Sequence, residues 1–407
     1  MDKIKNQKHS KEALYYSFSR MLERTSYYGL RSLIVLYMVG GILKMENAEA
    51  LSIYGWFTLS LVFSQILGAI LGDLLIGNKK ALIIGGIIQS LGAFSFCIPS
   101  NTGLYIGLFL VVLGGGLYTP NIISNFGKLY LNKTKLLDAG FTIFYLAVNF
   151  GAFFGVMSIG YIGEKYGWNF GFVIAGIIML LSIIPILFLK DKKIEQTTED
   201  KSTLNERIIK ISIAFVIVGL FWAIYELGNI RFFDLQLKLS EISTLNISKS
   251  IWASLNSVFT LPISILAIIV WTLFYNSQFF KLMLGFIFGI ISFGILFLIP
   301  EVPTEQHTII YLLSLLFLGI SETHIAPIIH SILTKNSNPK YLAILISLAF
   351  IPTRLFSIIF ELFNDKFYDT PTLGLKLGII AMTIVGIGLI VYVWWNKKRP
   401  ATYKNNE

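Results

Sequence analysis

Long apolar segments recur along the whole chain and are separated by short polar connections. We identify twelve such segments, each close to or above the length of about 20 residues that a membrane-spanning helix needs. They cover residues 12–40, 51–76, 81–99, 103–126, 138–162, 169–190, 208–230, 251–275, 280–300, 308–334, 341–362 and 373–395. The pattern predicts an all-α membrane protein with twelve transmembrane helices.

The longest polar stretch, residues 191–206, divides the predicted helices six and six. We therefore expect an N-terminal six-helix bundle over residues 1–190, a cytoplasmic linker over 191–206, and a C-terminal six-helix bundle with a tail over 207–407. Two six-helix bundles joined in this way resemble the major facilitator fold. That resemblance implies a substrate site between the two bundles, near the midplane of the bilayer.

Composition agrees with a membrane protein, and the distribution of charge predicts its orientation. The 407 residues are 55% hydrophobic and 14% charged, whereas soluble domains carry about 25% charged residues. The net charge of +10 would suit a nucleic-acid binder, but most of the 33 Lys and Arg residues fall in connections on one side of the predicted helices. Because basic connections stay in the cytoplasm, we expect a cell-membrane protein with both termini in the cytoplasm and no nucleic-acid partner.

The connection between the second and third predicted helices carries a spaced motif. Its residues are Gly68, Gly72, Asp73, Gly77, Lys79 and Lys80. The spacing G-x-x-x-G-D-x-x-x-G-x-K-K resembles the loop motif of the major facilitator superfamily, in which glycines allow close packing and an acid anchors the helix ends. The alternative is a polar turn whose lysines only follow the charge rule for cytoplasmic loops; the full spacing favours the motif.

Charged residues lie inside the first apolar segment. Arg20, Glu23, Arg24, Tyr27 and Arg31 follow one another at helical spacing, which places them on one face of a helix. A charge at the bilayer centre costs about 2.5–3.5 kcal/mol on insertion scales, and such residues usually face an internal cavity. The stripe predicts a polar cavity; the alternative is a set of ion pairs between helices that only holds the bundle together.

Several motifs together resemble the proton-dependent oligopeptide transporter family of the major facilitator superfamily. Residues 23–29, Glu-Arg-Thr-Ser-Tyr-Tyr-Gly, are similar to E-R-F-x-Y-Y-G in the family's first helix. Residues 138–151 are similar to the fifth-helix signature D-A-x-F-x-x-F-Y-x-x-I-N-x-G and form the most specific match. Weaker similarities lie at residues 114–121, 221–227, 252–259 and 321–327. The resemblance is stronger in the first half of the chain.

This resemblance implies a secondary active transporter that imports di- or tripeptides with protons by alternating access. A peptide presents an ammonium, a carboxylate and an amide, and a dry cavity must pair each of them. By analogy Glu322 binds the ammonium, while Arg24 lies near the carboxylate because its fork can bind both oxygens. The implied substrate-binding set also contains Tyr27, Tyr28, Asn121, Tyr145, Asn149, Trp222 and Asn256, with Trp252 as a further stacking surface.

The resemblance also implies residues for proton coupling and for gating. Arg20, Glu23 and Arg24 occupy the proton-coupling motif, and Arg31 with Glu226 occupies a pair that the family uses as an external gate. A pair that forms in only one state biases the transporter toward that state. A permanent structural ion pair is the alternative for Arg31 and Glu226.

Two departures from the family pattern fall inside the proton-coupling motif. Arg20 stands where the family has a glutamate, and Thr119 stands where it has a lysine in the fourth helix. The formal charge of this set therefore changes from zero to +1. Under a relocation hypothesis Arg20 replaces both lost groups and Glu23 is the remaining proton carrier. The alternative is that coupling is changed or lost, or that the substrate is not an ordinary peptide.

No catalytic pattern in the sequence supports an enzyme. The motifs G-x-S-x-G and H-E-x-x-H and a phosphate-binding loop ending in G-K-S/T do not occur. Cys97 is the one cysteine, which excludes an intramolecular disulfide and a cysteine metal cluster. We expect a monomer in the lipid bilayer with no cofactor or metal. The alternatives to a proton–peptide symporter are a facilitator, a major facilitator carrier for an amino acid or peptide-like metabolite, and a peptide sensor that does not transport.

Overall fold

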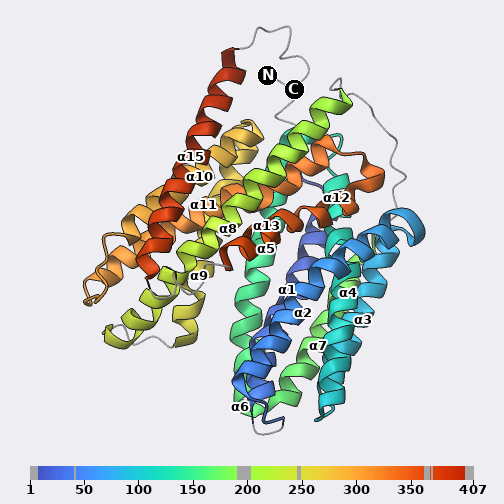
Figure 1. Ribbon diagram of the computed structural model, residues 1–407. Helices are drawn as coiled ribbons and strands as arrows, with labels where there is room; N and C mark the ends of the chain where they lie inside the picture. The colour runs from blue at the N-terminus through green and yellow to red at the C-terminus, as the bar shows by residue number, and fades with distance from the viewer. Residues whose placement is uncertain are drawn as a thin grey trace. The chain divides into compact units, whose positions relative to one another are not determined.

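All regular secondary structure in the described part of this computed structural model is helical (Figure 1). It comprises residues 8–40, 43–189, 203–244, 249–361, 367 and 370–398. The prediction of an all-α protein is confirmed. Most of the predicted linker, up to residue 202, and the end of the predicted tail, from residue 399, lie outside the described residues.

The chain forms two compact units. The first combines Met1–Glu195 with Ser337–Leu348, and the second combines Gln196–Asn336 with Ala349–Glu407. The division near residue 195 falls inside the predicted linker. The short segment Ser337–Leu348, which the sequence pattern assigns to the C-terminal bundle, belongs to the first unit.

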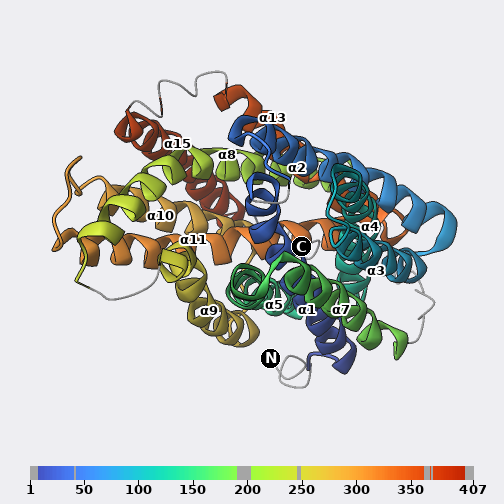
Figure 2. The same ribbon diagram turned by 90° about the horizontal axis from the view of Figure 1, so that it is seen from below.

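Helices of the first unit run alongside one another. They are α1 Lys11–Val39, α2 Asn47–Ile70, η1 Leu71–Ile76, α3 Asn78–Ser95, α4 Asn101–Lys128, η2 Thr134–Leu136, α5 Leu137–Phe154, η3 Gly155–Gly160, α6 Tyr161–Tyr166, α7 Trp168–Leu187, η4 Pro339–Tyr341 and α12 Leu342–Leu348. α3 and α2 pack along α4, and α1 packs along α5 and α7. Figure 2 shows the neighbourhood of α1, α5 and α7 from below.

Glycines allow these helices to approach closely. A Cβ added to Gly68 in α2 would lie 2.2 Å from the carbonyl oxygen of Gly116 in α4. A Cβ added to Gly85 in α3 would lie 2.7 Å from the carbonyl oxygen of Gly114. Since any larger residue would clash with backbone atoms, these contacts depend on the small residues that membrane helices use at their interfaces.

The loop-motif region ties α12 to the first unit. Gly77 has a φ of +86° at the turn before α3, a conformation that favours glycine. Asp73 accepts hydrogen bonds from Nδ2 of Asn78 at 2.8 Å and from the backbone N–H of Ile344 at 2.9 Å. Ile344 lies in the first turn of α12, where backbone N–H groups lack partners within the helix. Asp73 therefore anchors the start of α12. In the same motif, Nζ of Lys79 donates to the carbonyl oxygen of Leu189, after α7, at 2.5 Å.

The second unit contains the longer helices of the C-terminal part. They are α8 Leu204–Ile242, α9 Lys249–Leu273, α10 Gln278–Leu296, α11 His307–Asn336, α13 Phe350–Glu361 and α15 Pro371–Lys398. α10 packs against α11 and α15, while α8 packs against α11, α13 and α15, and α9 packs against α11. α11 is therefore the helix that joins α8, α9 and α10.

Ten helical stretches of the described residues are long and apolar enough to cross a membrane. Large apolar side chains such as Trp56 and Phe109 are exposed by 68% and 64%, as lipid-facing residues require. The predicted segments 12–40 and 81–99 are helical as α1 and α3 but are not among the ten. The reason lies in their composition, because α1 contains the charged stripe and α3 begins with two lysines.

Candidate functional site

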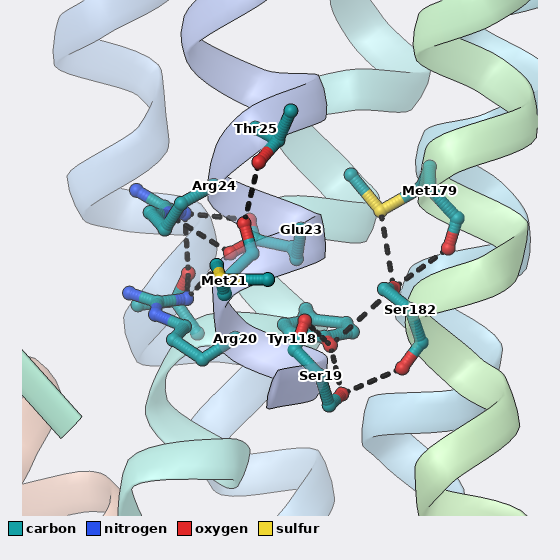
Figure 3. A network of polar contacts seen from close by, with 10 residues as sticks. Ser19, Arg20, Met21, Glu23, Arg24, Thr25, Tyr118, Met179 and Ser182 are labelled. Atoms are coloured by element: carbon teal, nitrogen blue, oxygen red, sulfur yellow. Dashed lines mark hydrogen bonds and ion pairs between the residues drawn. The ribbon is translucent and has the colours of Figure 1, made fainter. Parts of the chain in front are cut away.

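Arg20, Glu23 and Arg24 on the charged face of α1 form a largely buried cluster in the first unit (Figure 3), whereas Arg31 on the same face is exposed. Glu23 is 0% exposed and binds both of its arginine neighbours. Its Oε2 accepts from Nη1 of Arg20 at 2.9 Å and from Nε of Arg24 at 2.7 Å, and its Oε1 accepts from Nη2 of Arg24 at 2.6 Å. One carboxylate is therefore shared by two guanidiniums.

Thr119 in α4 contacts both arginines of the cluster. Its Oγ1 accepts from Nη1 of Arg20 at 3.2 Å and from Nη2 of Arg24 at 3.3 Å. The aromatic ring of Phe144 in α5 lies over Arg20, with 5.9 Å between the ring centroid and Cζ. The guanidinium of Arg20 thus reaches the side chain at the position where the family has a lysine.

Polar contacts on another side of α1 fix the rotation of this helix. Oγ of Ser19 donates to the carbonyl oxygen of Ser182 in α7 at 2.6 Å and lies 2.7 Å from the hydroxyl of Tyr118 in α4. Figure 3 shows these contacts across the helix from Arg20 and Arg24. Sequence reasoning missed all three residues, because a single hydroxyl in an apolar segment is a weak signal. They hold α1 so that its arginines point to one side.

Aromatic rings surround the next turn of the same face. The ring centroids of Tyr27 and Tyr28 lie 4.6 and 5.7 Å from Cζ of Arg24, close enough for cation–π contacts. Nε of Arg31 donates to the hydroxyl of Tyr54 in α2, a residue outside the predicted set. Glu226, the predicted gate partner of Arg31, belongs to the second unit, so the gate stays a prediction.

Three other predicted residues of the first unit lie in two different places. Tyr145 and Asn149 are half-buried on α5, and Nδ2 of Asn149 donates to the carbonyl oxygen of Tyr145 at 3.0 Å. Asn121 is fully buried in α4, where its Nδ2 donates to the carbonyl oxygens of Gly68 and Leu117 and its Oδ1 accepts from Asn78. Asn121 thus joins the loop-motif region, and a ligand there would have to displace these bonds.

A second polar cluster lies in the second unit. Nδ2 of Asn256 in α9 donates to Oε1 of Glu322 in α11 at 3.0 Å and to the hydroxyl of Tyr225 in α8 at 3.3 Å. The ring of Trp222 lies 5.3 Å from the ring of Tyr225. The structure brings together three predicted residues and adds Tyr225, which lies in the weakly matching segment 221–227 and is outside the predicted set.

Two buried polar atoms of α9 have no hydrogen-bond partner among the described residues. They are Oδ1 of Asn256 and Nε1 of Trp252. An unsatisfied buried polar atom costs about 1–3 kcal/mol, so most such atoms in proteins are paired. Oδ1 of Asn256 is therefore an unused hydrogen-bond acceptor, and Nε1 of Trp252 is an unused donor.

Comparisons with known proteins identify relatives of the chain. The model described as Major Facilitator Superfamily matches residues 16–361. A peptide transporter of Yersinia enterocolitica subsp. palearctica is 34% identical over 173 residues, which are 41% of this chain and 34% of that protein. Dipeptide and tripeptide permease A of Pectobacterium carotovorum subsp. carotovorum is 28% identical over 212 residues, which are 51% of this chain and 42% of the permease. The matches thus span less than half the length of these curated relatives.

Solved structures share the fold over nearly the whole chain. A crystal structure of a peptide transporter in complex with sulfate has a TM-score of 0.65 and 22% sequence identity, over 95% of this chain and 94% of that one. A transporter crystallised with 5-aminolevulinic acid has a TM-score of 0.65 and 20% identity, over 93% of this chain and 96% of that one. At these identities the likeness shows the fold.

Proposed function

Because the chain belongs to the Major Facilitator Superfamily, we propose that it is a secondary active transporter that imports di- or tripeptides with protons by alternating access. The matches to a peptide transporter and to a dipeptide and tripeptide permease support the resemblance to the proton-dependent oligopeptide transporter family. These relatives support a transporter rather than an enzyme. The proposal includes twelve transmembrane helices in two six-helix bundles, a place in the cell membrane, and both termini in the cytoplasm.

The observation that carries this proposal is the buried Arg20–Glu23–Arg24 cluster. It places three charged side chains in an apolar helix, where such residues mark substrate or proton pathways. In the proposed mechanism, uptake of a proton by Glu23 weakens its ion pairs with both arginines. Arg24, flanked by Tyr27 and Tyr28, can then bind the carboxylate of the peptide. Proton binding and peptide binding thus favour the same state, which is the thermodynamic requirement for coupling.

The second cluster carries groups whose chemistry suits the ammonium of a peptide. The carboxylate of Glu322 suits the peptide ammonium, and the unpartnered Oδ1 of Asn256 suits a backbone N–H. Trp222 and Tyr225 offer an aromatic surface for a side chain. The chain therefore carries both a carboxylate and guanidinium cations, the two kinds of charged group that a zwitterionic substrate requires.

The contact between Arg20 and Thr119 supports the relocation hypothesis. A cation from α1 reaches the α4 position where the family has a lysine. Arg20 therefore supplies beside Glu23 the positive charge that the family's lysine supplies, and Glu23 remains the proton carrier of the first helix.

The test is uptake of labelled dialanine into liposomes that contain the purified protein, with and without an inward proton gradient. The proposal predicts uptake that the gradient stimulates. Equal uptake in both conditions would indicate a facilitator. Absence of uptake by folded protein would favour another small solute, such as an amino acid or a peptide-like metabolite.

A further inference from the structure

The buried cluster on α1 holds one more cation than anion. The charged neighbours of Arg20 are the carboxylate of Glu23 and the guanidinium of Arg24. The cluster therefore contains two cations and one anion. Two nitrogens of Arg24 also bind Glu23, so the single negative charge is shared. A buried charge whose counter-ion is incomplete is costly, because little water reaches it.

Arg20 also keeps part of its hydrogen-bonding capacity unused. Its Nη1 donates to Glu23 and Thr119, whereas its Nε is buried and has no hydrogen-bond partner in the part of the chain that the structure describes. The residue is only 5% exposed. A cationic N–H donor binds an anionic acceptor more strongly than a neutral one. An anion is therefore the partner that would bind Arg20 most strongly.

We propose that Arg20 binds a second carboxylate of the substrate and makes the carrier prefer peptides whose C-terminal residue is acidic. The inference rests on the proposed function, in which Arg24 binds the terminal carboxylate. Both guanidiniums reach the hydroxyl of Thr119 and lie on the same side of α1 (Figure 3). Two anions that bind there must be close together, as the α-carboxylate and the side-chain carboxylate of a C-terminal glutamate are.

Charge balance explains why the second anion arrives with the substrate. When Glu23 carries the transported proton, the cluster keeps the two positive charges of Arg20 and Arg24. A peptide with a neutral C-terminal side chain balances one of them, whereas a peptide that ends in glutamate balances both. The acidic peptide therefore leaves no unpaired guanidinium in the buried site.

The experiment compares Ala-Glu with its neutral isostere Ala-Gln as competitors of labelled dialanine uptake. We expect Ala-Glu to inhibit at a concentration about tenfold lower, because a charge-assisted hydrogen bond typically contributes at least this factor. Glu-Ala and Gln-Ala control for position, since their acidic or amide side chain lies at the other end of the peptide. Equal potency of Ala-Glu and Ala-Gln would overturn the inference while leaving peptide transport intact.

Variants assign the preference to Arg20. Arg20→Gln should bring the potency ratio of Ala-Glu to Ala-Gln close to one, and Arg20→Lys should keep part of the preference. Lys165→Gln removes the same charge from an exposed position of the first unit and should keep the full ratio. If Arg20→Gln does not transport, thermal unfolding in the presence of each dipeptide measures binding instead. The ratio of the Ala-Glu and Ala-Gln concentrations that raise the unfolding temperature equally then replaces the potency ratio.

Two results would contradict the role of Arg20. A preference that persists in Arg20→Gln would place the second anion elsewhere. Dialanine uptake that depends on chloride, without any preference for Ala-Glu, would assign the unpaired cation to a free inorganic anion. Failure of every dipeptide to compete or bind would instead remove the proposed function, and this inference with it.

Discussion

Side chains around Glu23 depend on one another because they share one carboxylate and one hydroxyl. Arg20 and Arg24 both bind Glu23, and both reach Thr119. The sequence predicts the common face of Arg20, Glu23 and Arg24, because helical spacing alone determines it. It does not predict the contact of Arg20 with Thr119, since that contact depends on how α1 is rotated against α4. Tyr225 was missed for the same reason.

The double variant Arg20→Glu with Thr119→Lys tests whether Arg20 has taken over two functions. It restores the family-type set, with two glutamates, one arginine and one lysine, and returns the formal charge to zero. We expect proton-driven dialanine uptake at the wild-type rate or above. Thr119→Lys alone should lower the rate, because it places a third cation beside one buried carboxylate. Loss of all uptake in a folded double variant would refute the relocation hypothesis.

Helix packing in the first unit depends on backbone contacts at glycine positions. The loop-motif spacing in the sequence indicates close packing at Gly68, but not the helix that it meets. The structure identifies this helix as α4, whose Gly116 carbonyl oxygen leaves no space for a side chain. Gly116 lies in the weakly matching segment 114–121, where the sequence alone gives no partner.

Gly68→Ala should destabilise the first unit, because the new Cβ would lie 2.2 Å from a backbone oxygen. Overpacking of this kind typically costs about 1–3 kcal/mol. Gly55→Ala in the same helix is the matched control, since nothing lies within 4 Å of its added Cβ. Thermal unfolding of the purified protein should show a lower midpoint for Gly68→Ala and an unchanged or higher midpoint for Gly55→Ala. Equal midpoints would contradict the close α2–α4 contact.

The start of α1 is attached to the connection that follows α4. Nδ1 of His9 lies 2.9 Å from the hydroxyl of Tyr130, and Nζ of Lys133 donates to the carbonyl oxygen of Lys8 at 3.0 Å. Burial, with a smaller effect of the nearby Lys133 ammonium, lowers the pKa of His9. The folded protein therefore favours the neutral imidazole of this residue.

This attachment predicts a pH dependence of stability. As the pH falls through the ordinary histidine pKa of about 6.5, the unfolded chain binds a proton at His9 before the folded chain does. The stability contribution of His9 is thus present above that pH and declines below it. The drop of the unfolding midpoint between about pH 7.5 and about pH 5.5 should be smaller in His9→Gln than in the wild type. The same drop in both proteins would show that His9 does not contribute.

At the scale of the whole molecule, the sequence predicts the class of fold well. Each of the twelve apolar segments overlaps helical structure in the described residues, ten helical stretches there are long and apolar enough to cross a membrane, and the boundary of the two units falls in the predicted linker. The attachment of Ser337–Leu348 to the first unit could not be predicted. It includes the hydrogen bond from the backbone of Ile344 to Asp73, far away in the sequence, and the packing of α12 against α2 and α4. Apolar periodicity carries no information about such contacts.

Coupling of peptide uptake to protons through Glu23 is the central claim for the molecule as a whole. The most direct test is dialanine uptake by Glu23→Gln in liposomes with and without an inward proton gradient. Lys165→Gln, a substitution at an exposed position outside the cluster, is the control. We predict that the gradient stimulates uptake by the wild type and by Lys165→Gln but no longer by Glu23→Gln, whose amide cannot exchange a proton. Undiminished stimulation of Glu23→Gln would show that the proton travels by another group.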